Sequence, residues 1–222
     1  MRRVILVALA SLMVLLPAVV YGGTLFDDFE KENDFWVVNS GEWKIENGVY
    51  HQADIVTNGS SGVFSYIEGS NEWGNDFTIE VKLNIQAGTS REVGVIYKWQ
   101  DISNHFHTMI DESDAVVRIN NIVAGTWQQN QNINMPFSLN EWYDLKVIVK
   151  EDNYQIFVDG KKIQEYDREA AVDTGFLGLK TVTTEAFFDD FKVTGPNVPD
   201  FGSPVECAGK LAATWGQIKC RR

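Results

Sequence analysis

Apolar and polar side chains alternate along several segments of the chain. From residue 77 to residue 85 the odd positions are Phe, Ile, Val, Leu and Ile, whereas the even positions are polar. Apolar residues also recur at every second position from Tyr143 to Val149 and from Tyr154 to Val158. Successive side chains of a strand point to opposite faces. The pattern therefore predicts strands with one buried and one solvated face.

Turn signals separate these strands. Glu151-Asp152-Asn153 and Asp159-Gly160 interrupt the alternation, and Asp111-Glu112-Ser113-Asp114 is typical of a turn between strands. No long helical pattern precedes residue 200. Many short strands at roughly ten-residue spacing predict an all-β fold, a two-sheet antiparallel β-sandwich or jelly roll.

The first and last predicted strands carry almost the same sequence. Phe26-Asp27-Asp28-Phe29 opens the patterned region and Phe188-Asp189-Asp190-Phe191 closes it. We expect these two strands to lie side by side, which would bring both acidic pairs together.

The two ends of the chain differ from the patterned region. Residues 1–23 have Arg2 and Arg3, an apolar run and Gly22-Gly23, which is typical of a secretory signal peptide, with an uncleaved membrane anchor as the alternative. We expect one domain at 24–195, no other membrane span, and a secreted or cell-envelope protein. Residues 196–222 form a Pro- and Gly-containing linker and a C-terminal tail.

Charge and cysteine content narrow the function classes. The chain has 19 Lys and Arg against 31 Asp and Glu, and such an acidic surface repels nucleic acid phosphates. Cys207 and Cys220 both lie in the tail, where an exported chain could form one local disulfide or an intermolecular one. Neither cysteine has a histidine nearby, so they are poor zinc ligands.

Several segments together resemble the concanavalin A-like, laminin-G-like jelly rolls of secreted bacterial proteins. The resemblance covers residues 25–194 and implies a two-sheet sandwich with one concave outer face where relatives hold glycans. The segments that carry it are Phe26–Phe29, Gly41–Tyr50, Asp76–Val81, Val93–Asp101, Asn104–His107, Trp142–Val147, Val158–Gly160, Gly175–Leu179 and Phe188–Val193.

The resembling group contains both enzymes and binding modules. Its glucanases carry Glu-x-Asp-x-Glu on one strand, whose alternate carboxylates supply the acid and the nucleophile. The nearest stretch here, Thr78–Asn84, has one carboxylate on its wet face, Glu80. The missing pair favours binding over hydrolysis.

The resemblance also implies a structural calcium ion. The matching ligands are Asp28 or Glu30 near the first strand, the carbonyl of Gly41, and Asp190 of the last strand. Calcium takes six to eight oxygen ligands, so water molecules would complete this set. The alternative is that the acidic residues cap strand ends without metal.

Aromatic and amide side chains indicate how a concave face could bind sugar, because sugar rings present apolar C–H faces and hydroxyl groups. His105 and His107 lie two apart on a predicted strand and would face one side, in a polar groove rather than a metal site that lacks a third ligand. The candidate ligand-binding residues are Tyr97, Trp99, His105, His107, Trp127 and Gln129.

The sequence thus predicts a non-catalytic carbohydrate-binding, lectin-like module whose partner is a polysaccharide or glycan. A sugar-processing glycoside hydrolase of the same fold is the first alternative, and a protein-binding laminin-G-like adhesion module is the second. An exposed aromatic and amide groove would favour sugar, whereas a large flat apolar patch would favour protein.

Overall fold

The computed structural model describes residues 22–56, 62–167 and 172–201. Antiparallel strands make up most of this part of the chain, and its one helical element is the 3-10 helix η2 (Ser70–Glu72). No helix in the described ranges is long and apolar enough to cross a membrane. Cys207, Cys220, the linker and tail beyond residue 201, and the signal segment up to residue 21 lie outside the described residues.

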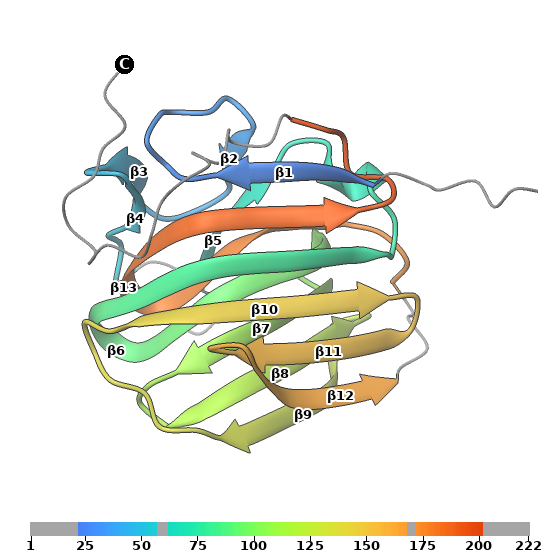
Figure 1. Ribbon diagram of the computed structural model, residues 1–222. Coiled ribbons are helices and arrows are strands. Elements are labelled where there is room, and N and C mark those ends of the chain that lie inside the picture. The colour runs from blue at the N-terminus through green and yellow to red at the C-terminus, as the bar shows by residue number, and fades with distance from the viewer. Residues whose placement is uncertain (1–21, 57–61, 168–171, 202–222) are drawn as a thin grey trace, which may run out of the picture.

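The strands form two layers that face each other (Figure 1). Their bounds are β1 (Gly23–Asp27), β2 (Trp36–Val38), β3 (Trp43–Glu46), β4 (Val49–Gln52), β5 (Val63–Ile67), β6 (Phe77–Asp101), β7 (Asn104–Asp111), β8 (Val116–Val123), β9 (Thr126–Asn134), β10 (Trp142–Lys150), β11 (Asn153–Val158), β12 (Lys161–Asp167) and β13 (Phe176–Gly195). This arrangement confirms the predicted all-β jelly-roll sandwich.

The two longest strands, β6 and β13, run through both layers. In the first layer, the N-terminal half of β6 pairs with β10 and with the C-terminal half of β13, which also pairs with β1 and β4. In the second layer, the C-terminal half of β6 pairs with β7, and the order continues to β8 and β9. Shifts of register near 182–186 of β13 mark the passage between the layers, because bulges bend a strand.

The core lies between the layers and follows the predicted alternation. The odd positions 77–85 of β6 are all buried, as are Leu145, Val147 and Val149 of β10. Tyr154, Ile156 and Val158 of β11 are fully buried as well. Full burial of one such apolar side chain contributes about 1.5–3 kcal/mol.

The predicted neighbours at the two ends of the domain are confirmed. Strand β1 pairs antiparallel with β13, with Asp27 opposite Phe191 (Figure 1). The predicted turns at Glu151–Asp152, Asp159–Gly160 and residues 112–115 are also present.

Candidate functional site

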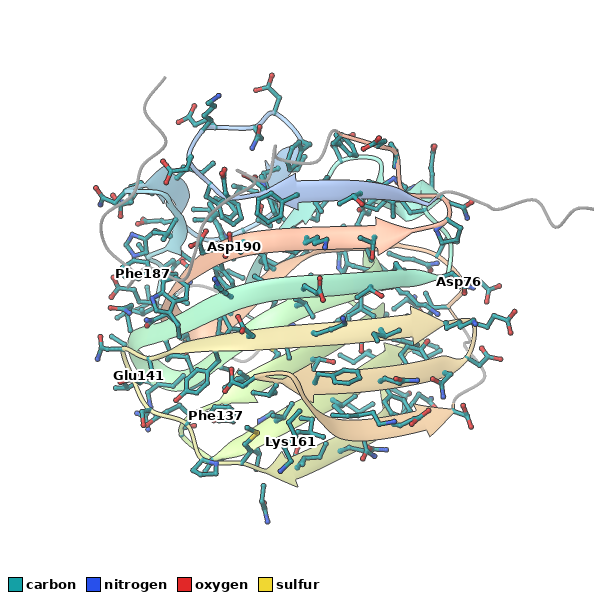
Figure 2. All side chains as sticks on the ribbon, in the orientation of Figure 1. Asp76, Phe137, Glu141, Lys161, Phe187 and Asp190 are labelled. Atoms are coloured by element: carbon teal, nitrogen blue, oxygen red, sulfur yellow. The ribbon has the colours of Figure 1, made fainter. Side chains whose placement is uncertain are left out.

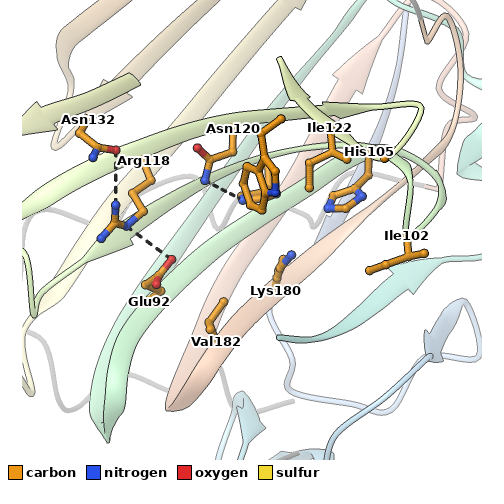
Figure 3. Close-up of a pocket in the computed structure, with 12 residues that line it drawn as sticks. Glu92, Ile102, His105, Arg118, Asn120, Ile122, Asn132, Lys180 and Val182 are labelled. Atoms are coloured by element: carbon orange, nitrogen blue, oxygen red, sulfur yellow. Dashed lines mark hydrogen bonds and ion pairs between the residues drawn. The ribbon is translucent and has the colours of Figure 1, made fainter. Parts of the chain in front are cut away.

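A groove of about 720 Å³ lies on the outer face of the second layer (Figure 3). Such a volume is in the range of ligand pockets. Strands β6, β7, β8, β9 and β13 each contribute at least one side chain, because alternate residues of each strand point away from the core. The labelled side chains Glu92, Arg118, Asn120 and Lys180 converge on this groove from strands β6, β8 and β13 (Figure 3).

The two histidines of β7 lie in this groove. His105 and His107 both line it and stack with their ring centroids 5.5 Å apart, whereas Phe106 between them packs in the core. The structure therefore places both imidazoles on one face, as the spacing indicates.

The hydrogen bonds identify which nitrogen of each neutral imidazole carries the proton. Nδ1 of His105 donates to the carbonyl oxygen of Asp101 at 3.3 Å, which leaves Nε2 as an acceptor. Nε2 of His107 accepts from Nδ2 of Asn120 at 3.0 Å. Burial and the nearby Lys180 lower the pKa of His105 to about 4 and lower the pKa of His107 well below its usual value. Both imidazoles are therefore uncharged at neutral pH.

Lys180 of β13 is the most unusual side chain of the groove. It lines the groove although it is only 4% exposed, and its neighbours Leu179 and Thr181 are buried too. Burial lowers the pKa of its ammonium group to about 8, against the opposing effect of the Glu92 carboxylate. A lysine with a pKa near neutrality can carry a proton in one step of a reaction and release it in another.

An ionic cluster forms one wall of the groove. Nη2 of Arg118 lies 2.6 Å from Oδ2 of Asp111, whose side chain is fully buried, and Nε of Arg118 lies 3.7 Å from Oε2 of Glu92. Burial, together with the nearby Asp111 carboxylate, raises the pKa of Glu92 to about 6. The cluster holds charged and hydrogen-bonding groups in fixed positions beside Lys180.

Trp127 of β9 stands at the rim of the groove. Its side chain is 53% exposed, and its ring meets the edge of His107 at a centroid distance of 6.0 Å. Gln129 lies on the same strand, but its side chain is outside the described part of the structure. Trp127 thus offers an aromatic face next to polar groups.

Tyr97 and Trp99, both predicted to bind ligand, do not share a strand face. Lys98 between them has a positive φ of 52°, and the register of β6 shifts here against both neighbouring strands. Tyr97 is fully buried in the core, where its hydroxyl group pairs with Thr108, and it does not line the groove. Trp99 packs with Phe64 on the outer face.

The acidic residues predicted to bind calcium have protein partners instead. Oδ2 of Asp190 lies 2.6 Å from Nζ of Lys82, and Oδ1 of Asp28 accepts from the backbone N–H of Glu30 at 3.3 Å. Gly41 has a positive φ of 90° in a turn. Within the described ranges, no three His, Cys, Asp or Glu residues form a group suited to a metal ion. The carboxylates of Asp28 and Asp190 are therefore each engaged by a protein group.

The calcium ion itself stays a prediction, and thermal unfolding tests it. A bound ion would raise Tm as its concentration increases, because it binds only the folded state. We expect Tm in excess calcium to exceed Tm in a chelator if the prediction holds. Equal Tm values under the two conditions would contradict the predicted calcium binding.

Sequence reasoning missed four polar residues of the groove: Glu92, Arg118, Asn120 and Lys180. Lys180 alternates with Leu177 and Leu179, so the sequence assigned it to the outer face of its strand, where a lysine is ordinarily exposed. Nothing in the local sequence indicated that the strand would bring Lys180 beside His105.

Three solved structures illustrate the fold of the chain. The carbohydrate binding module CBM66 from Bacillus subtilis is 21% identical, with a TM-score of 0.61 over 71% of this chain and 94% of that chain. A protein of unknown function with a galectin-like fold, also from Bacillus subtilis, is 10% identical, with a TM-score of 0.63 over 79% and 98%. A lichenase derived from a mouse hindgut metagenome is 10% identical, with a TM-score of 0.59 over 78% and 99%.

Comparison of the sequence with protein families assigns the chain to one of them. A search of curated proteins finds no match. The model of the 3-keto-alpha-glucoside-1,2-lyase-like domain matches residues 21–194, which includes every strand of the groove. The chain has the carbohydrate-related jelly-roll fold, and it belongs to the family of 3-keto-alpha-glucoside-1,2-lyase-like domains.

Proposed function

We propose that the groove binds a 3-keto-α-glucoside and eliminates the substituent at C1. The observation that carries this proposal is Lys180, which is buried in the groove with a pKa lowered to about 8. Perturbed pKa values of this kind gather at functional sites. A site that only held a sugar by stacking would not require a buried amine, and the family description supplies the reaction class.

The chemistry follows from the ketone at C3. The ketone acidifies the hydrogen at C2, and the neutral amine of Lys180 accepts that proton as a general base. The electron pair of the C2–H bond passes into an enolate, which the new ammonium group stabilises. The enolate then forms the C1=C2 double bond and expels the C1 oxygen substituent. Lys180 returns the proton to the departing oxygen, so that the amine is regenerated.

The remaining groups of the groove position the sugar in this proposal. Nε2 of His105 is an acceptor for a sugar hydroxyl group, since Nδ1–H is held by the Asp101 carbonyl. Glu92 and Arg118 provide an acceptor and donors at the other side. Trp127 offers its ring to an apolar face of the sugar.

The test compares one glucoside in two oxidation states. Methyl 3-keto-α-glucoside should release methanol and form an unsaturated ketone in the presence of the protein. Methyl α-glucoside should stay intact, because without the ketone its C2 hydrogen is not acidic. Methanol release followed by NMR reports both reactions, and equal inertness of the two glucosides would contradict a catalytic role.

Non-catalytic sugar binding is the second candidate, and the half-exposed Trp127 favours it. The structural likeness to a carbohydrate binding module fits this candidate as well. The oxidised glucoside distinguishes the two candidates, because a non-catalytic module would bind it without converting it to product.

Trp127→Ala should weaken saccharide binding about tenfold, because the stacking face is lost. The matched control is Trp142→Ala, since Trp142 is also exposed, at 44%, but lies on β10 in the first layer. Isothermal titration calorimetry with the unreactive parent glucoside measures both variants. Trp127 would be removed from the site if its variant and the control kept equal affinity.

A further inference from the structure

Strand β13 reverses its faces at Thr183, at one end of the groove. Leu177 and Leu179 belong to the core before this residue, whereas Ala186 and Phe188 belong to the core after it. The inward face therefore changes from odd to even positions, and the positive φ of 44° at Thr183 marks the change. A β-branched residue rarely adopts such a backbone conformation, which persists only where surrounding contacts hold it.

Threonine hydroxyl groups hold this reversal against strand β6. The pairing register of the two strands is interrupted between Val182 and Thr184. Here the backbone N–H of Ser90 donates to Oγ1 of Thr183 at 3.1 Å. The backbone N–H of Glu92 donates to Oγ1 of Thr184 at 2.8 Å. Two side chains of β13 therefore bind the backbone of β6 where the regular register is broken.

Thr184 ties a groove residue to β13. Its side chain is fully buried, and its hydroxyl group donates to the carbonyl oxygen of Val182 while it accepts the N–H of Glu92. Val182 lies directly opposite Glu92 in the register of the two strands. One hydroxyl group thus links Glu92 to the strand from which Lys180 enters the groove (Figure 3).

We propose that Thr184 is a positioning residue of the groove, whose hydroxyl group holds Glu92 in a fixed place relative to Lys180. This inference rests on the proposed function in that it assigns both groups to one reacting site. Irregularities in strand pairing are frequent beside active sites, where they re-aim a side chain. Without the hydroxyl group, the N–H of Glu92 would lose its acceptor, and this part of β6 would shift to find another.

Glu92 is the group whose charge acts on Lys180. Its carboxylate raises the pKa of Lys180 against the larger, opposing effect of burial. On β5, Lys180 lies opposite Phe64, which carries no charge. The other titratable side chains that line the groove are two uncharged imidazoles of β7 and a guanidinium group of β8 that is paired with a buried carboxylate: His105, His107 and Arg118. Displacement of Glu92 should therefore lower the pKa of Lys180 further.

NMR titration of isotope-labelled lysine side chains tests the inference without a substrate. The resonance that is absent from Lys180→Met identifies Lys180. Thr184→Val removes the hydroxyl group but keeps the shape of the side chain, so Lys180 should titrate at lower pH than in wild type, where its pKa is about 8. Thr184→Ala, a second variant without the hydroxyl group, should give the same direction. Thr184→Ser keeps the hydroxyl group and should restore the wild-type titration.

Turnover gives a second readout. Thr184→Val should raise KM for methyl 3-keto-α-glucoside about tenfold, because Glu92 is no longer placed to accept a sugar hydroxyl group. The matched control is Thr108→Val, since Thr108 is also fully buried but its hydroxyl group pairs with that of Tyr97 in the core, at 3.1 Å. It should leave both KM and the titration of Lys180 unchanged. Thermal unfolding and circular dichroism establish that each variant is folded.

The outcomes separate the two proposals. A Lys180 titration that stays at the wild-type pH in Thr184→Val and Thr184→Ala, or that moves as far in Thr108→Val, would overturn the positioning role. A shifted titration that Thr184→Ser does not restore would overturn it as well, because the hydroxyl group would not be the cause. A shifted and restored titration in a protein that leaves the ketone substrate intact would overturn the elimination and leave the positioning of Glu92 standing.

Discussion

Lys180→Met should lower kcat/KM for a 3-keto-α-glucoside by about 10²–10⁴-fold, the contribution of a positioned general base. Methionine is unbranched and one heavy atom shorter than lysine, so it fills most of the same space but cannot accept a proton. The wild-type rate should also rise as pH increases through about 8, because the pKa of Lys180 is lowered to about 8 and only its neutral amine accepts the C2 hydrogen. Initial rates at a series of pH values measure both effects.

Lys98→Met is the matched control for this variant. Lys98 is also a buried lysine whose pKa burial lowers to about 8, but its Nζ lies 2.9 Å from the Tyr154 hydroxyl group and does not line the groove. The Lys98→Met variant should therefore turn over the 3-keto-α-glucoside at the wild-type rate. Equal rates for wild type and Lys180→Met, with both folded, would exclude Lys180 as the base.

Arg118→Met should destabilise the domain by about 3–5 kcal/mol, the usual cost of removing one partner from a buried ion pair. The Asp111 side chain is fully buried, and Oδ2 receives Nε and Nη2 of Arg118 at 2.7 Å and 2.6 Å. Without the guanidinium group, the buried Asp111 carboxylate would lose its ion-pair partner. For a domain of this size the loss corresponds to a fall in Tm of roughly 6–20 °C.

Arg91→Met is the control for charge removal alone. Arg91 pairs with Glu112, and both side chains keep part of their surface in solvent. Such pairs contribute about 0–1 kcal/mol, so its Tm should stay near that of wild type. Calorimetric unfolding of the two variants side by side gives the comparison. A fall of the same size for both would mean that burial of Asp111 does not set the cost.

The fold followed from the sequence because burial acts on alternate residues of a strand. The odd positions from 77 to 85 are all in the core, and the adjacency of β1 and β13 was visible in their shared Phe-Asp-Asp-Phe segments. Turn residues at 159–160 fixed where the chain reverses. These signals are local, so a single sequence contains them.

The site was harder to predict from the sequence than the fold, because it depends on departures from regular alternation. His105 and His107 were placed in the groove by their spacing, and Trp127 by its aromatic ring next to amide side chains. Tyr97 was misplaced because a bulge at Lys98 reverses the faces of β6, and nothing in the residue types at 97–99 marks that bulge. Lys180 comes from β13, far along the chain, so only the strand order β13-β6-β7 brings it into the same groove as His105 and His107.

The most direct test of the account follows the hydrogen at C2. A 3-keto-α-glucoside carrying deuterium at C2 is incubated with the protein in ordinary water, and the sugar product is analysed by mass spectrometry and NMR. Elimination predicts that the product has lost the deuterium, whether or not the unsaturated ketone later takes up water. Release of the C1 substituent with the deuterium retained would indicate direct hydrolysis and contradict the account.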